Sequence, residues 1–265
     1  EERIARLTSI FATFRNPDKE TVLTPWRVVN MHLSDSLGGY CFMNEDFTTP
    51  IDQPRYIEHK GVTTEVFHPR SVILDINSKS GLYPLYATYS IYRKRVEEAR
   101  EKYGEINRSA ALMLWDRTLE ENIFVVCKTP MARYITMRTL RGFRNAVVHA
   151  KDYPNLIENI TSQPDSVVNM LRSGKKFWKI NNDENMKIDA IIGNPPYITY
   201  SNLNKTTRSF IKKNFIVCSD GKPDYYYAFI EMSIKVLADD GKLAYLIPNN
   251  IFKNRFADRL RTFML

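Results

Sequence analysis

One stretch decides the fold of this chain: residues 188–197, which read IDAIIGNPPY. Its first half is short, branched and apolar, which is typical of a buried strand, and the glycine and two prolines that follow end the strand. Open α/β sheets bind ligands just beyond the carboxyl ends of their strands. We therefore expect a core strand over 188–193 and a ligand-binding loop over 194–197.

Further core strands are expected on both sides of this one, and helices alternate with them. The predicted strands are 71–75, 123–126, 146–148, 188–192 and 243–247. Helices are predicted over 3–14, from Thr24-Pro25 to Gly38-Gly39, from Pro84 onward, and over 226–237, with a turn at 16–18. Strands that alternate with helices predict a mainly parallel, doubly wound α/β sheet. Residues 40–70 show an irregular pattern and are expected to form an excursion before the sheet.

The composition bounds the class of protein. With 265 residues the chain is long enough for one large α/β domain, and its net charge of +8 and pI near 9.3 favour a polyanionic partner such as nucleic acid. Three scattered cysteines and four histidines without ligand spacing predict neither disulfides nor a metal site. The absence of a long apolar run or signal peptide predicts a cytoplasmic protein without a membrane segment. Because the chain starts without Met and stops inside a helical pattern, we expect it to be part of a longer protein.

The residue types of the loop suit binding of a planar amino group. The Asn194 side-chain oxygen and the Pro195 carbonyl can accept the two N–H bonds of an amine conjugated to a ring and stabilise positive charge that builds on it. Pro195 and Pro196 stiffen the loop and remove backbone donors. Tyr197 offers a face on which a base can stack, worth roughly 1–3 kcal/mol. A proline-rich turn with a packed tyrosine is the alternative reading of the same residues.

Asn-Pro-Pro-Tyr after an apolar strand resembles the catalytic motif of S-adenosylmethionine-dependent amino-methyltransferases, above all the gamma-class N6-adenine DNA methyltransferases of the Type I and Type IIG restriction–modification kind. The resemblance covers residues 20–265. It implies a Rossmann-like methyltransferase core over 71–265, incomplete at its C-terminus, preceded by an N-terminal helical segment over 1–70. It also implies methylation of an adenine flipped out of double-stranded DNA, with Asn194, Pro195, Pro196 and Tyr197 as the catalytic residues.

The resemblance also implies a set of cofactor-binding positions upstream of the catalytic strand. Thr24 and Pro25 match the start of the cofactor-gating helix, with Thr24 expected as its cap, and Asp152 matches the acid that holds the cofactor's adenine. The cofactor loop is expected to contribute Asp75, Asn77, Ser80 and Gly81. Lys79 stands where the family has Gly, and Cys127 stands where it has an acid for the ribose hydroxyls. These two departures predict weak cofactor binding.

Four basic residues follow the catalytic loop and could contact phosphates beside a flipped base: Lys205, Arg208, Lys212 and Lys213. A solvated basic helix explains the same pattern equally well. The family implies that sequence recognition depends on a further C-terminal target-recognition domain or subunit.

Two other functions remain open. Similar Asn-Pro-Pro-Tyr loops methylate protein glutamine or RNA, although the upstream Thr-Pro helix and the long gap before the catalytic strand favour DNA. Alternatively, the altered cofactor loop indicates a non-catalytic DNA-binding module.

Overall fold

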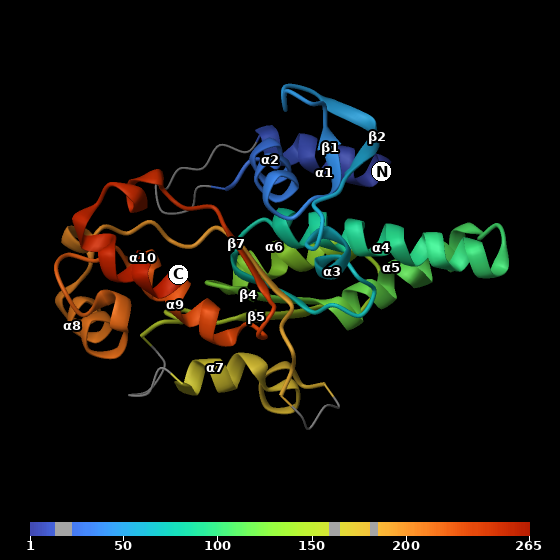
Figure 1. The fold of residues 1–265 in the computed structure, drawn as a ribbon. Coiled ribbons are helices and arrows are strands. Elements are labelled where there is room, and N and C mark those ends of the chain that lie inside the picture. Colours follow the sequence, from blue (N-terminus) through green and yellow to red (C-terminus); the bar gives the residue numbers. More distant parts are fainter. Residues whose placement is uncertain (14–22, 159–164, 181–184) are drawn as a thin grey trace. The chain divides into compact units, whose positions relative to one another are not determined.

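A computed structural model describes residues 1–13, 23–158, 165–180 and 185–265 (Figure 1). The chain forms two compact units, Glu1–Asp152 and Tyr153–Leu265. In each unit parallel strands are connected through helices, so the chain has the doubly wound, Rossmann-like α/β fold predicted from the sequence.

The first unit contains three parallel strands in the order β5-β4-β3. They are β3 (Ile73–Ser78), β4 (Ile123–Cys127) and β5 (His149–Asp152). All five side chains of β4 are buried, as expected for a strand covered on both faces. The carboxyl ends of the three strands lie at one edge, where Ser78 pairs with Cys127 and Cys127 pairs with Asp152.

Two of these strands begin later than the sequence predicted. Ser71 belongs to the preceding turn, because its hydroxyl donates to the Glu65 carbonyl at 2.6 Å. Val147 is 47% exposed and precedes β5 rather than forming its centre. Apolar content therefore located β3, whereas the predicted strand 146–148 shares no residue with β5 and lies directly before it.

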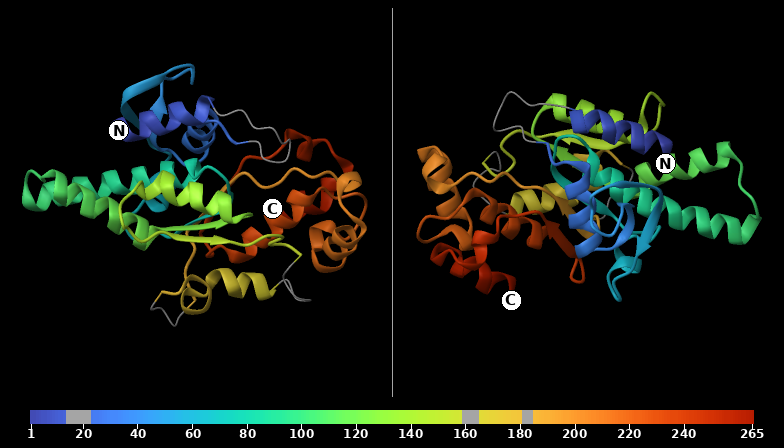
Figure 2. Two further views of the ribbon diagram at one scale, coloured as in Figure 1. Left: turned by 180° about the vertical axis from the view of Figure 1, so that it is seen from behind. Right: turned by 90° about the horizontal axis from the view of Figure 1, so that it is seen from above.

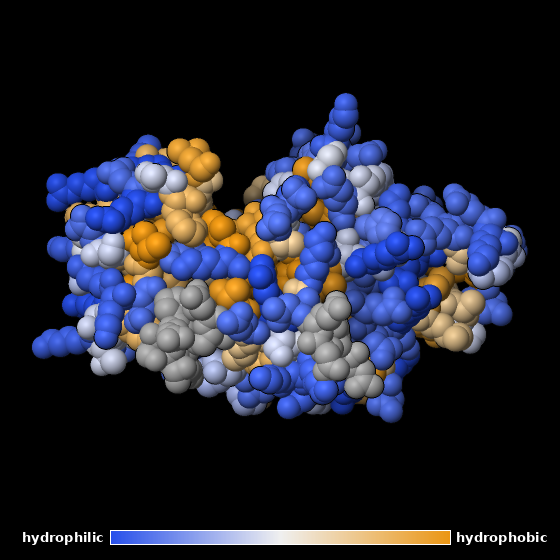
Figure 3. Space-filling model, turned by 60° about the horizontal axis from the view of Figure 1, so that its bottom comes forward, coloured by the Kyte–Doolittle hydropathy of each residue, from blue (hydrophilic) through white to orange (hydrophobic). Residues whose placement is uncertain are grey.

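Two long helices lie side by side in this unit and project beyond its strands (Figures 1 and 2). The first, α4 (Leu82–Tyr103), confirms the helix predicted near Pro84, whereas α5 (Arg108–Asn122) was not predicted. Few side chains of α5 are buried, so its apolar periodicity is weak. The Asn107 side chain caps the helix and was the local signal for its start. The space-filling view shows hydrophilic side chains over most of this projecting end, at the right (Figure 3).

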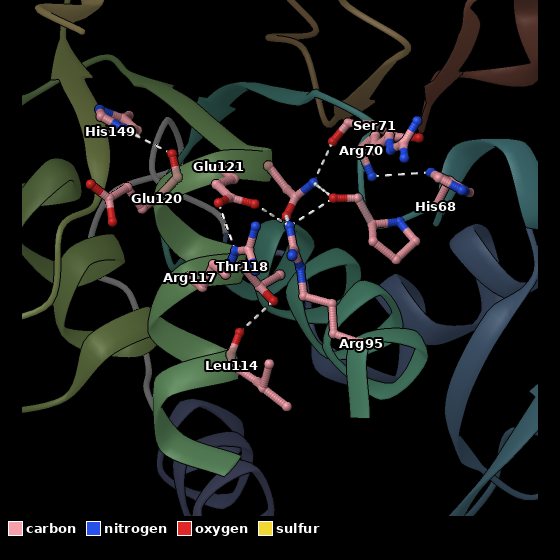
Figure 4. A network of polar contacts seen from close by, with 12 residues as sticks. His68, Arg70, Ser71, Arg95, Leu114, Arg117, Thr118, Glu120, Glu121 and His149 are labelled. Carbon is pink, nitrogen blue, oxygen red and sulfur yellow. Dashed lines mark hydrogen bonds and ion pairs between the residues drawn. The ribbon is translucent and has the colours of Figure 1, made fainter. Parts of the chain in front are cut away.

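A buried polar network fastens α4 and α5 to the segment before β3 (Figure 4). Arg95 of α4 donates to the Pro69 carbonyl at 2.7 Å, to Glu121 at 2.5 Å and to the Asn122 side chain at 2.9 Å. Asn122 in turn donates to the carbonyls of Pro69 and Ser71. A buried guanidinium requires such partners, and here they align the two helices with the start of the sheet.

The N-terminal part of the unit differs from the sequence prediction. It contains α1 (Glu2–Thr13), α2 (Trp26–Ser36), α3 (Thr63–Val66) and an antiparallel hairpin of β1 (Gly39–Met43) and β2 (Pro50–Ile57). The prediction of irregular structure over 40–70 is therefore wrong for the hairpin. Every residue of β1 is buried, and the Phe42 amide donates to the buried Asn30 side chain at 2.7 Å. The turn expected at 16–18 lies outside the described residues.

The second unit is built around β6 (Ala190–Gly193) and β7 (Lys242–Tyr245), which pair in parallel. Its helices are α7 (Asp165–Arg172), α8 (Lys205–Asn214), α9 (Tyr225–Val236) and α10 (Asp258–Met264), with a π-helix at Gly174–Trp178. The predicted apolar helix is confirmed as α9, which is buried from Tyr225 to Ser233. Ile188 and Asp189 precede β6, and their carbonyls accept from the amides of Ala238 and Lys242.

Within the described ranges, none of the helices has the length and apolar character needed to cross a membrane. No cluster of three or more His, Cys, Asp or Glu side chains in the same ranges is arranged to hold a metal ion. The three cysteines are buried and free.

Candidate functional site

The Asn-Pro-Pro-Tyr loop leaves the buried strand β6 directly and rises to the surface of the second unit. Gly193 ends the strand at φ 142, and its carbonyl accepts from the Leu246 amide at 3.0 Å. Asn194 is half-buried with its side-chain oxygen out of contact with solvent, Pro195 is buried, and Tyr197 is 44% exposed. The motif therefore presents its aromatic ring at the surface while its polar atoms lie deeper.

Tyr197 is held in place from two sides. Its hydroxyl donates to the Leu246 carbonyl just after β7, and its ring meets the Tyr226 ring edge-on with centroids 6.2 Å apart. Burial raises the pKa of Tyr197 to about 12, so the hydroxyl keeps its proton and remains a donor. A ring fixed in this way needs little further ordering when a flat ligand stacks on it.

The rest of the loop is fastened to the start of α9. The Tyr225 amide donates to the Ile198 carbonyl at 2.9 Å, and the Tyr200 amide donates to the Asp224 carboxylate at 3.3 Å. Burial raises the pKa of Asp224, while the Tyr200 amide and the Asn250 side chain act in the opposite direction. Asp224 thus holds the loop through a hydrogen bond to its backbone.

A third contact joins α9 to the segment after β7, where the Tyr226 hydroxyl donates to the Asn250 side chain at 3.1 Å. Residues 224–226 and 246–250 were not predicted to belong to the site. The structure shows that they support the loop. The signal that could have marked them is an acidic residue, Asp224, directly before a helix that begins with three tyrosines.

The four predicted DNA-contacting residues all lie on α8, which begins after the loop with the Asn204 side chain accepting from the Thr207 amide at 2.7 Å. They form two pairs. Lys205 and Lys213 are exposed. Arg208 and Lys212 are half-buried over the Tyr200 ring, 5.1 and 5.2 Å from its centroid. The left edge in Figure 3, where α8 lies, carries mainly hydrophilic side chains.

Sequence reasoning missed Glu158, which ties the turn after Tyr153 to both α8 and α9. Its carboxylate accepts from the Thr207 hydroxyl at 2.9 Å and from the Tyr225 hydroxyl at 2.6 Å. Because one carboxylate serves both helices, it sets the position of the basic helix relative to the start of α9. No local pattern marks Glu158, since its partners lie about 50 to 70 positions away in the chain.

The expected cofactor loop lies at the carboxyl end of β3, in the first unit, and packs on α6 (Pro130–Arg141). The Ser78 hydroxyl lies 3.2 Å from the Thr136 hydroxyl, and the Ser80 carbonyl accepts from the Thr139 hydroxyl at 2.7 Å. Gly81 adopts φ +77 at the start of α4, where a Cβ atom would lie 3.0 Å from the Thr136 Cα. The loop therefore turns tightly because it contacts α6.

Two members of this loop are less buried than the others. Asn77 is half-buried and adopts the left-handed φ of 69, a conformation that Asn tolerates better than most residues. Lys79, which stands in place of the expected Gly, is half-buried, and burial together with the Lys128 charge lowers its pKa. The loop edge is thus more basic than a glycine-rich loop.

Asp75 is buried within β3, with 1% of its surface exposed. Neither of its carboxyl oxygens has a donor in good hydrogen-bond geometry among the described residues, although the Ser78 hydroxyl lies nearby. Burial raises the pKa of Asp75 to about 7, and the nearby Ser78 hydroxyl opposes this shift. A buried carboxyl without a donor is an unusual group, and its need for a donor fits a position beside a ligand.

The ends of β4 and β5 complete this edge. Burial, followed by the charge of Asp75, raises the pKa of Cys127 to about 12, so the side chain is a neutral thiol. Asp152, opposite Cys127, is half-exposed, and a carboxylate oxygen lies 3.8 Å from Arg133 Nε. The structure thus brings Asp75, the cofactor loop and Asp152 to the same edge of the three strands. At this edge Cys127 provides a thiol where an acid was expected.

The predicted gating helix is α2, which begins at Trp26 rather than with Thr24 as its cap. Pro25 occupies the cap position and is exposed, no side chain caps the helix, and Thr24 is half-buried. Proline at the cap lacks a side-chain acceptor, which corrects the expected role of Thr24. The helix still contacts the element after the cofactor loop, because His32 Nδ1 lies 3.0 Å from the Tyr83 hydroxyl in the first turn of α4.

Similarity to known proteins bears on this arrangement. Over 79 residues the chain is 37% identical to the Type II methyltransferase M.HincII of Haemophilus influenzae, and the match covers 29% of this chain and 16% of that protein. It is 34% identical over 82 residues to the Type II restriction enzyme and methyltransferase RM.Eco57I of Escherichia coli, covering 30% of this chain and 8% of that protein. The chain thus spans a small part of these relatives.

A solved structure shares the fold. It is the ATP-dependent Type ISP restriction–modification enzyme LlaBIII bound to DNA, with a TM-score of 0.57, 15% identity, and coverage of 97% of this chain and 17% of that one. The family model described as Eco57I restriction-modification methylase matches residues 121–265, more than half of the chain. This match includes β4, the strand β6 and the Asn-Pro-Pro-Tyr loop. The chain therefore belongs to the Eco57I restriction-modification methylase family.

Proposed function

We propose that this chain is the methyltransferase part of a restriction–modification enzyme and that it methylates the N6 amino group of adenine in DNA. The observation that carries the proposal is the Asn-Pro-Pro-Tyr loop, which follows a buried strand and is fastened by Tyr197, Asp224 and the start of α9. Family membership and the DNA-bound relative support it. A rigid loop of acceptors with an exposed aromatic ring suits a flat amine.

Each loop residue has a role in this reaction. Asn194 Oδ1 and the Pro195 carbonyl accept hydrogen bonds from the two N–H groups of the target amine. They stabilise the positive charge that builds on the nitrogen as it is alkylated. Tyr197 stacks on the base. No strong general base is needed before methyl transfer, because the amine proton becomes acidic only once the nitrogen carries the new bond. Positioning is therefore the main task of these residues.

The cofactor of the proposed reaction is S-adenosylmethionine, which supplies a methyl group on a positively charged sulfur. Asp75, with its unpartnered buried oxygens, suits a ligand that brings donors. Asn77, Ser80 and Gly81 would line the methionine part, and Asp152 would accept from the adenine amino group. Thr24 and Pro25 immediately precede α2, which contacts α4, and would cover this side. Cys127 provides no charge for the ribose hydroxyls, and we propose that the affinity is weak.

The proposed partner is double-stranded DNA with the target adenine flipped out of the helix. Lys205 and Lys213 are exposed on α8 and suit contacts to phosphates, whereas Arg208 and Lys212 support the Tyr200 ring. We also propose that residues 1–70 act as an N-terminal segment carrying the gating helix, that residues 71–265 form the methyltransferase core, and that a further domain or subunit reads the DNA sequence.

The test is methyl transfer to duplex DNA by the full-length protein that contains this chain. Asn194→Ala should lower the rate of transfer about 10²–10³-fold while leaving cofactor affinity nearly unchanged, because one preorganised acceptor is lost. Asn202→Ala, at an exposed amide three residues past Thr199 and outside the motif, is the matched control and should retain activity. Activity of the Asn194 variant within a few-fold of the wild type would contradict the assignment.

RNA and a glutamine-containing protein substrate, assayed beside DNA, separate the other methylation reactions. The departures at Lys79 and Cys127 favour one further candidate, a DNA-binding module that does not catalyse. Calorimetry with S-adenosylmethionine decides between a methyltransferase and this non-catalytic module. Absence of binding together with retained DNA affinity would establish the non-catalytic module.

A further inference from the structure

Phe252 is an exposed aromatic residue that the fold does not require. It ends a short 3-10 helix, Asn249–Phe252, and 76% of its surface is exposed, while its neighbour Ile251 is buried at 1% exposure. Ile251 therefore anchors the segment and Phe252 points away from the core. A ring this exposed contributes little to the stability of the free protein, and single exposed apolar side chains are common, so what distinguishes Phe252 is its surroundings.

The segment that carries Phe252 is held firmly. Arg261 of α10 donates to the carbonyls of Ile251 at 2.5 Å and Asn254 at 3.0 Å. The Asn254 side chain donates to the Tyr227 hydroxyl on α9 at 3.2 Å. Backbone on both sides of Phe252 is therefore tied to two helices, which limits the motion of the ring to rotation of its own side chain.

The same segment supports the catalytic loop. Leu246 accepts from the Tyr197 hydroxyl, and Asn250, two residues before Phe252, accepts from the Tyr226 hydroxyl. Phe252 and Tyr197 are thus two exposed aromatic rings on one hydrogen-bonded framework. Lys253 and Arg255 are exposed beside Phe252 and provide positive charge. An aromatic ring flanked by two cations suits a surface with bases and phosphates.

We propose that Phe252 packs against the DNA bases next to the flipped nucleotide and stabilises the gap that the target base leaves. This proposal rests on the proposed function, because it requires a target base that leaves the helix. Unstacking a base is unfavourable, and apolar side chains inserted between base steps offset that cost in other DNA-binding proteins. Lys253 and Arg255 then contact the phosphates on either side.

The test measures base flipping directly, with 2-aminopurine at the target position of a duplex that carries the recognition sequence of the full-length protein. Fluorescence should rise when the wild type binds. Phe252→Ala should lower the fluorescence rise about tenfold or more, and should lower kcat/KM for methylation equally on the same duplex with adenine at the target position, whereas Phe252→Trp should retain most of both. Ile216→Ala, which alters another exposed apolar residue of the same unit at 60% exposure, is the matched control.

A second duplex, in which the target base faces a mismatch, separates flipping from general binding. Flipping costs less there, so the Phe252→Ala defect should shrink to within a few-fold of the wild type. An equal defect on matched and mismatched duplexes, or no defect on either, would overturn the role of Phe252. If the wild type raises fluorescence on the 2-aminopurine duplex but transfers no methyl group to the duplex with adenine at the target position, the proposed reaction fails while the flipping result still tests Phe252. If the wild type does not raise fluorescence, both proposals fall.

Discussion

Asp75 shows how burial makes one side chain sensitive to pH. The carboxyl group is buried, both oxygens lack a hydrogen-bond partner within the described ranges, and burial raises its pKa from 3.8 to about 7. The folded state therefore binds this proton more tightly than the unfolded state does. Its effect on stability is absent below about pH 4, and the free energy of unfolding falls as the pH rises toward 7.

Asp75→Asn should remove this pH dependence. Ionisation of Asp75 costs the folded protein up to about 4 kcal/mol above pH 7, an upper bound obtained from the pKa difference. In the variant, the free energy of unfolding from urea denaturation should change less between pH 4 and 7 than in the wild type. Asp220→Asn, at an exposed carboxylate, is the control. Parallel curves for wild type and the Asp75 variant would show that Asp75 does not titrate in this range.

The two ends of α4 differ in what surrounds their glycines. Gly81 at the start and Gly104 at the end adopt nearly the same φ, +77 and +78. A Cβ at Gly81 would lie 3.0 Å from the Thr136 Cα and 3.2 Å from two of the side-chain atoms on α6, whereas a Cβ at Gly104 would meet nothing within 4 Å. Their ψ angles differ, 13 at Gly81 and −145 at Gly104, so alanine meets backbone strain at both positions and more of it at Gly104, whereas only Gly81 contacts α6.

Alanine at Gly81 combines a mild backbone strain with a clash. The left-handed φ and ψ of Gly81 should cost alanine about 1 kcal/mol, and the displacement of α6 should cost about 1–3 kcal/mol more. Gly104→Ala tests strain without a contact and should cost about 1–3 kcal/mol, because ψ −145 at positive φ is a conformation that alanine rarely adopts. Chemical denaturation of both variants measures these losses. A loss of about 1 kcal/mol or less for Gly81→Ala would mean that α6 moves away from the loop easily, and the tight packing of the cofactor loop would then be incidental.

The charge of the whole chain is +8, and a basic chain binds DNA through phosphates in a salt-dependent way. We expect weak binding that is indifferent to sequence for this chain alone. Lys205→Ala and Lys213→Ala should each reduce the slope of log Kobs against log salt by about 1, since each exposed lysine neutralises one phosphate. Lys212→Ala should change it less, because Lys212 lies over Tyr200.

Fluorescence anisotropy with a labelled duplex over a range of salt concentrations measures these slopes. Lys102→Ala, at an exposed lysine near the end of α4, is the control for loss of net charge. Equal slopes for the α8 variants and this control would mean that the phosphates are contacted elsewhere on the chain. Protection of one defined sequence by this chain alone would contradict the expected lack of specificity.

Much of the fold could be predicted because its signals are local. Branched apolar runs at β4 and β6 and the apolar periodicity of α9 are each contained within about a dozen residues, and the structure confirms these elements. The hairpin of β1 and β2 was missed because its irregular pattern became a buried strand only through Asn30 and other distant contacts. The helix α5 was missed because it buries few of its side chains.

The sequence by itself determined the core strands β4 and β6, the helix α9, the family and the loop at the end of β6, since each depends on residues adjacent in the chain. Only the tertiary structure decided that Tyr197 is held by Leu246, that Glu158 joins α8 to α9, and that Asp75 lies buried without a partner. These features arise from contacts between segments far apart in sequence. Burial and hydrogen bonding at such contacts depend on how the elements pack, which no short pattern of residues records.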